Sequence, residues 1–331
     1  MGHPLYPGVL QRLARLCKLI FVRQNSRFLE IPLDILYAII ERLPLQSAIL
    51  LSQACRVLWY QFGDRCFSIL QRCTAEQRLD TLTALGSLLP DHYLCVICNA
   101  LHCIDYDDHP ASETQSITRS ARPCSSVENW DNTHHVALHA SSFRHIQLAI
   151  KYTHMKFSHQ AYRQRLLQKF EYTYSASDFL TCKCIGEPRI VGGRYILMTS
   201  CVFSTRSMPC WYELISELTI SFCPHSAIGP LSDLAEHPFN AVVRQAFRCP
   251  SNPRPEFFSC DRCPTDMTIL VKENEACIVC WSDLGRGESS QDSSWQSQLW
   301  TLENSQHEES PFRYCHGSIR ELYTTFIACE A

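Results

Sequence analysis

Cysteine pairs separated by two residues are the feature of this sequence best suited to carry chemistry. The 331-residue chain contains 20 cysteines and 14 histidines. A structural zinc ion takes about four sulfur or nitrogen ligands in a tetrahedron, usually from two short-spaced pairs. The sequence shows no secretory signal peptide, so we expect metal sites or reduced thiols rather than a disulfide framework.

The pair Cys260 and Cys263 lies in the segment FFSCDRCPTDMTI, between two runs with strand character. At such a turn, backbone N–H groups can point at the thiolates and stabilise their charge. The segment Cys223-Pro-His225, which also follows an expected strand, is its natural partner. We predict that these two cysteines, Cys223 and His225 bind one structural zinc ion. The alternatives are a reduced structural turn, or a site completed by other residues such as Cys182 and Cys184.

A second cysteine pair, Cys95 and Cys98, lies in the segment YLCVICNALHC. The predicted zinc ligands here are Cys95, Cys98, His102 and Cys124, and the fourth ligand could equally be Cys103 or His139. The alternative is a helix with buried thiols, because the residues between the two cysteines are apolar. A third pair, Cys277 and Cys280, is flanked by apolar residues that favour a buried strand with core thiols.

Strands are predicted from about residue 188 onward. The segment RIVGGRYILMTSCVF places Gly192-Gly193 between two β-rich runs, which indicates a hairpin. Further expected strands are WYELISELTISF, FFSC, MTILVKE and EACIVCWSDL. Residues 143–170 have helical periodicity, and SIRELYTTFIACEA predicts a closing helix. Polar loops are expected at 105–131 and 285–310. The fold class is therefore α+β.

Residues 28–62 predict three short helices. Ile31-Pro32 opens the first, because proline suits a first helical position. The apolar stripe of that helix is Ile35, Leu36, Ile39, Ile40 and Leu43. Leu43-Pro44 ends it, since the residue before a proline is pushed out of the α region. A second apolar helix follows, and a third begins near Arg56.

This layout resembles the F-box, a protein-binding module of roughly 40 residues. Two positions depart from the pattern: Ser47 stands where an acidic residue is common, and Leu58 stands where tryptophan is common. The resemblance implies docking on the Skp adaptor of a cullin–RING ubiquitin ligase. The residues that it implicates in this docking are Ile31, Pro32, Leu36, Ile40, Leu43, Pro44, Leu51, Cys55 and Leu58.

Beyond the F-box, the chain is similar to a group of filamentous-fungal F-box proteins along most of its length. The shared features are Cys95, Cys98 and Leu101-His102; Cys223, Pro224 and His225; Cys260, Cys263 and Thr265-Asp266; Trp281; Asp283-Leu284-Gly285; and Gly287. That resemblance implies no particular client protein.

Three segments are expected along the chain. Residues 1–24 form an amphipathic helix, for which a mitochondrial transit segment is the competing interpretation. Residues 25–75 form the F-box, and residues 76–331 form a Cys-rich, mixed helical and antiparallel-β domain with structural zinc sites. The absence of an internal repeat argues against a propeller or leucine-rich solenoid.

Composition and motifs favour an adaptor over an enzyme. The net charge of −3 gives no reason to expect nucleic-acid binding, and no apolar run approaches the ~20 residues of a membrane helix. Nucleotide-binding, nucleophile-elbow and metalloprotease motifs are absent from the sequence. We expect a cytoplasmic or nuclear, non-catalytic subunit that recruits an unknown client to the ligase. The alternatives are a cullin-independent scaffold on the Skp adaptor and, less favoured, a zinc-dependent enzyme.

Overall fold

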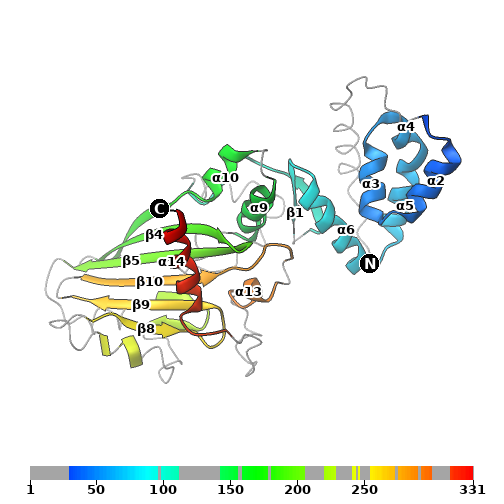
Figure 1. Ribbon diagram of the computed structural model, residues 1–331. Coiled ribbons are helices and arrows are strands. Elements are labelled where there is room, and N and C mark those ends of the chain that lie inside the picture. Colours follow the sequence, from blue (N-terminus) through cyan, green and yellow to red (C-terminus); the bar gives the residue numbers. More distant parts are fainter. Residues whose placement is uncertain are drawn as a thin grey trace. The chain divides into compact units, whose positions relative to one another are not determined.

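The computed structural model divides the chain into two units, residues 1–104 and 105–331. Both are visible in Figure 1, in which helices fill the first unit and a large sheet dominates the second. The structure describes residues 30–95, 98–111, 142–155, 159–177, 180–205, 220–228, 241–243, 245–246, 254–272, 275–289, 292–299 and 314–330. The predicted helix at 1–24 lies outside these residues. The α+β prediction, with helices at the N-terminus, is confirmed.

Helices follow one another through most of the described N-terminal unit. They are α2 (Leu33–Arg42), α3 (Leu45–Gln53), α4 (Arg56–Leu58), the π-helical turn η2 (Trp59–Gly63), α5 (Asp64–Arg72) and α6 (Ala75–Leu88). Helix α2 begins directly after Pro32, and α3 begins directly after Pro44. Leu43 adopts an extended conformation between them, as expected for a residue that precedes proline.

One apolar core joins these helices. Leu36 and Ile40 lie one helical turn apart on α2 and are buried with Ile49, Leu58 and Phe62. Spacing of three and four residues places such side chains on one helical face. The same core includes side chains of α6 and of a hairpin formed by β1 (His92–Cys95) and β2 (Ala100–Cys103). The unit therefore continues past residue 75, the predicted end of the F-box.

The C-terminal unit is built on a six-stranded antiparallel sheet. In spatial order its strands are β3 (Phe170–Ser177), β4 (Leu180–Val191), β5 (Arg194–Thr205), β10 (Glu275–Asp283), β9 (Thr265–Val271) and β8 (Glu256–Ser259). Gly192 and Gly193 both have positive φ at the β4–β5 turn, which confirms the predicted hairpin. A separate small hairpin contains β6 (Ile220–Cys223) and β7 (Ser226–Ile228).

The two faces of this sheet carry different cores. Helix α14 (Ser318–Glu330), predicted from sequence, covers one face and packs Ile319 and Tyr323 against Ile196 and Trp281. Figure 1 shows this helix running across the strands. The opposite face carries the larger core, which includes seven of the buried cysteines together with Phe222, Met267 and Ile269. The candidate sites of this unit lie in that second core.

Two predictions for the C-terminal unit need correction. The helical run expected at 143–170 is divided into α9 (Phe143–His154) and α10 (Gln160–Leu166), and Phe170 instead begins β3. The loop expected at 285–310 contains the short helix α13 (Ser293–Gln296). Trp295 is buried there against Phe143. The buried Trp295 helps to anchor the described part of this segment, and its Ser- and Gln-rich surroundings hide that signal in the sequence.

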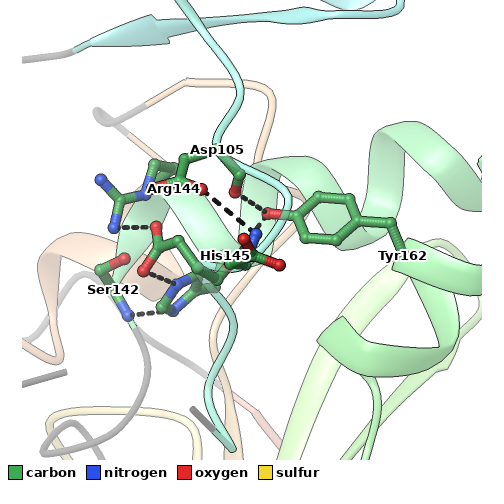
Figure 2. A network of polar contacts seen from close by, with 7 residues as sticks. Asp105, Ser142, Arg144, His145 and Tyr162 are labelled. Carbon is green, nitrogen blue, oxygen red and sulfur yellow. Dashed lines mark hydrogen bonds and ion pairs between the residues drawn. The ribbon is translucent and has the colours of Figure 1, made fainter. Parts of the chain in front are cut away.

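A polar network ties the described start of the predicted 105–131 loop to α9 and α10 (Figure 2). Asp108 forms an ion pair with Arg144, and its Oδ1 lies 3.4 Å from His145 Nε2. The Ser142 N–H donates to His145 Nδ1, and the Tyr162 hydroxyl donates to the Asp108 carbonyl oxygen at 2.8 Å. These contacts hold residues 105 and 108 against α9 and α10, which is a structural role.

No helix within the described ranges is long and apolar enough to span a membrane.

Candidate metal centre

Two turns of the chain meet where Cys223, His225, Cys260 and Cys263 come together. Cys223 ends β6, and His225 lies in the turn that leads to β7. Cys260 directly follows β8, and Cys263 lies in the turn before β9. Side chains in turns are not bound to the alternation of a strand, so all four can point toward one position.

The four candidate ligand atoms lie within 4.8 Å of one another. One contact between the two segments joins Cys260 Sγ and His225 Nδ1, at 3.8 Å. All three cysteines are buried, while His225 is partly exposed. Metal–sulfur bonds of ~2.3 Å in a tetrahedron place ligand atoms about 3.8 Å apart. The cluster could therefore hold a metal ion with small side-chain adjustments, and the structure brings together all four residues that the sequence predicted as one site.

The turn between the two cysteines is closed by its own backbone. The Cys260 N–H donates to the Thr265 carbonyl oxygen at 2.9 Å, and the Thr265 N–H donates to the Cys263 carbonyl oxygen at 2.7 Å. The Arg262 N–H points at Cys260 Sγ, at 3.4 Å. Such an N–H stabilises a thiolate and orients it as a ligand. This geometry is the one expected from a Cys-x2-Cys pair at a hairpin turn.

The sulfur atoms of this cluster influence one another's ionisation. Hydrogen bonds from Cys223 and Cys263, with a smaller contribution from His225, hold the pKa of Cys260 well below its usual range. Burial raises the pKa of Cys223 and that of Cys263 well above theirs. One thiolate is thus favoured, and further ionisation in so buried a place requires a cation. A bound metal ion would supply that positive charge.

The strand that leaves this turn also holds the C-terminal helix. Asp266 is buried, and its Oδ1 accepts hydrogen bonds from the Ser259 hydroxyl at 2.6 Å and the Gly317 N–H at 3.0 Å. Its Oδ2 accepts from the N–H groups of Ile319 and Arg320, each at 2.9 Å. A carboxylate at a helix N-terminus satisfies unpaired N–H groups and complements the helix dipole. Sequence separation of more than fifty residues concealed this role.

The second predicted metal group lies on the β1–β2 hairpin of the N-terminal unit. Cys95, Cys98 and His102 offer ligand atoms that all lie within 4.8 Å of one another. Cys98 Sγ is 3.0 Å from His102 Nε2, and Asn99 takes a positive φ at the turn between the strands. The segment is a hairpin, so the alternative of a helix with buried thiols is wrong.

The fourth ligand of that group is not found among the described residues. Cys103 Sγ lies 3.6 Å from His92 Nε2, and Cys103 does not join the three converging side chains. Cys124 and His139, the other predicted candidates, lie outside the described residues. Three of the predicted ligands are therefore placed together, and Cys124 remains a prediction.

The other described cysteines of the large sheet separate into two kinds. Cys280 is buried in the large core and Cys277 is half-buried, and neither joins a metal-competent group among the described residues. By contrast, Cys182, Cys184 and Cys201 form a third buried group. The sequence suggested Cys182 and Cys184 only as alternative ligands for the Cys260 site, and it did not indicate Cys201. The available signal was the Cys-x-Cys alternation, which places both side chains on one face of a strand.

The residues implicated in docking by the F-box resemblance occupy three environments. Leu36, Ile40 and Leu58 are buried in the helical core. Ile31, Leu43, Leu51 and Cys55 are half-buried and pack against that core, while Pro32 and Pro44 are exposed.

Comparison with protein-family models, with curated proteins and with solved structures found no match to this chain.

Proposed function

We propose that this protein is a non-catalytic adaptor of a Skp–cullin–F-box ubiquitin ligase. Its N-terminal helices would dock on the Skp-family adaptor, and its C-terminal unit would present a client protein. Tethering then raises the effective concentration of client lysines near the ubiquitin-charged conjugating enzyme. The observation that carries the proposal is the helical segment between Pro32 and Pro44, whose limits coincide with the proline positions of the F-box pattern.

Exposed apolar side chains on the same helices support a partner surface. Leu33 and Ile35 on α2 are 44% and 48% exposed, and Val57 on α4 and Tyr60 on η2 are 55% and 81% exposed. The inner faces of these helices hold the core, and these side chains are not members of it. Exposed apolar groups of this kind are typical of protein interfaces. In this proposal they contact the adaptor, while Leu36, Ile40 and Leu58 maintain the helices.

Zinc completes the proposal as a structural ion. Cys223, His225, Cys260 and Cys263 supply four protein ligands, which fill a tetrahedron and leave no position for a substrate or a catalytic water. That arrangement favours a structural role over the zinc-dependent enzyme. In the N-terminal unit, Cys95, Cys98 and His102 would bind a second ion, with Cys124 as the predicted fourth ligand.

Affinity capture of the full chain tests the adaptor. Ile35→Asp combined with Val57→Asp places charges on the exposed face without disturbing the core, so we expect loss of the Skp-family adaptor from the captured material. Truncation of interface anchors costs about 2 kcal/mol or more, which is roughly thirty-fold in affinity. Leu88→Asp is the matched control, because Leu88 is 52% exposed at the end of α6, outside the F-box segment.

Four results separate the possible outcomes. Adaptor and cullin captured together by the unchanged protein, and lost together in the double variant, support the ligase. Adaptor captured without cullin supports the cullin-independent scaffold instead. Equal capture by the unchanged protein and the double variant contradicts this docking surface, and no adaptor captured by the unchanged protein contradicts the F-box assignment.

A further inference from the structure

A third group of thiols lies within the large sheet, separate from the two turn-based groups. Cys182 and Cys184 are two residues apart on β4, so their side chains share one face of the strand. Cys201 lies directly opposite Cys184 on the neighbouring strand β5. The ladder of two long, regularly paired strands thus places three sulfur atoms side by side. Each cysteine is at most 1% exposed.

The three sulfur atoms converge more closely than packing alone requires. Cys184 Sγ lies 2.9 Å from Cys201 Sγ and 3.4 Å from Cys182 Sγ. All three ligand atoms lie within 4.8 Å of one another. The neighbouring Cys280 belongs to the same core, yet it does not join this group. Cysteine that serves only as a small apolar side chain has no reason to direct its sulfur at two others.

A hydrogen-bond donor also faces the group. Tyr172 on β3 pairs with Cys184 across the sheet, and its side chain hydrogen-bonds to the Cys184 sulfur. Hydrogen bonds to coordinated sulfur stabilise its negative charge in a dry environment. Apolar side chains surround the group, including Leu180, Phe203 and Ile278. The position therefore combines soft ligands, a polar donor and exclusion of water.

We propose that Cys182, Cys184 and Cys201 bind one thiophilic d10 cation, Zn²⁺ or Cu⁺, as a second metal site of the C-terminal unit. Thiolate ligands select these soft ions over Mg²⁺ or Ca²⁺. Each thiol that becomes a ligand loses its proton to solvent as the metal–sulfur bond forms. The ion would join β4 to β5 within the sheet and add to the stability of this face. The site needs no ligand from the Cys260 cluster, so it stands apart from the proposed zinc centre.

Native mass spectrometry of the folded protein tests this site by counting bound metal. The protein is prepared once with zinc and once with Cu⁺ under reducing, anaerobic conditions, which distinguishes the two ions. We expect Cys184→Ser to bind one metal ion fewer than the unchanged chain. We expect the double variant Cys184→Ser with Cys260→Ser to bind two fewer, because the two sites are independent.

Cys280→Ser is the matched control. It makes the same substitution at a buried position of the same core, and we expect no change in metal content. Equal metal content in Cys184→Ser and the unchanged protein in both the zinc and the Cu⁺ preparation overturns the proposal. Equal losses in Cys184→Ser and Cys280→Ser also overturn it, because the loss would then reflect damage to the core.

A measurement on the unchanged protein tests whether Cys184 and Cys201 instead form a disulfide. It does not depend on a variant that folds. The protein is unfolded without reductant, in the presence of a chelator and an alkylating reagent, and its peptides are weighed. The proposal predicts that Cys182, Cys184 and Cys201 are all alkylated. A disulfide between Cys184 and Cys201 would leave both unalkylated, and that result would overturn the proposal.

Discussion

The pairs Cys260–Cys263 and Cys277–Cys280 have the same spacing and opposite environments. The first pair occupies a turn between β8 and β9, and both of its sulfur atoms join a four-residue cluster. The second pair lies within β10, and neither of its sulfur atoms joins a metal-competent group among the described residues. Two cysteines separated by two residues thus indicate a metal site only where the backbone turns.

Strand geometry explains this difference. Positions three apart on a strand face opposite sides of the sheet, so Cys280 enters the large core while Cys277 does not. Cys277 instead lies near the Ser200 hydroxyl, at 3.9 Å. Positions two apart do share a face, and Cys182 and Cys184 show the result on β4. Cysteines at positions i and i+2 therefore indicate a shared site in a strand, whereas cysteines at positions i and i+3 indicate one in a turn.

The largest effect is expected when the turn pair loses a sulfur. Cys260→Ser should remove one zinc equivalent and destabilise the C-terminal unit by more than the ~0.5–3 kcal/mol of an ordinary substitution. The reason is that metal affinity becomes folding free energy when the site exists only in the folded state. Metal analysis and thermal unfolding check this. Full zinc content in Cys260→Ser would contradict the assignment of the Cys260–Cys263 pair as zinc ligands.

The next largest effect should come from the strand after the turn. Asp266→Ala removes a buried carboxylate that holds the start of α14, and hydrogen bonds to charged groups contribute about 1.5–3 kcal/mol each. We expect a loss of about 3 kcal/mol or more, with zinc retained, and faster proteolysis of α14. Denaturant unfolding with metal analysis measures both. Asp261→Ala, at an exposed position of the turn, is the control and should change little.

A smaller effect is expected at the buried member of the strand pair. Cys280→Ser places a hydroxyl in an apolar core, and a buried polar group without a partner costs about 1–3 kcal/mol. Zinc content should not change. Burial also raises the pKa of Cys280 well above its usual range, so alkylation of this thiol in the folded protein should be slow. Loss of zinc in this variant would contradict the comparison, because Cys280 belongs to no metal-competent group among the described residues.

The smallest effect on stability is expected at Cys277, the other cysteine of the strand pair. Cys277 is half-buried and faces away from the large core, so Cys277→Ser should change the free energy of unfolding by about 0.5 kcal/mol or less. Its zinc content should equal that of the unchanged protein. Alkylation followed by mass spectrometry should label Cys277 before Cys280. The reverse order would contradict the assigned faces.

Local pattern was sufficient to predict much of the fold. Glycines at 192 and 193 identified the β4–β5 hairpin because two successive positive φ values suit few other residues. The strand-like runs MTILVKE and EACIVCWSDL identified β9 and β10, and prolines marked the end of α2 and the start of α3. The short helix α13 within the expected loop at 285–310 was not predicted, because burial of Trp295 depends on Phe143, which lies far away in the chain.

By itself, the sequence determined the cysteine pairs, their spacing and the turns that carry them, because these depend on neighbouring residues alone. The pairing of Cys223 and His225 with the Cys260 turn was predicted, and the structure supplies its distances. Only the tertiary structure decided that Cys201 faces Cys184 and that Asp266 holds α14. Both depend on strand register and helix docking, which join residues distant in the chain through the packing of a shared core.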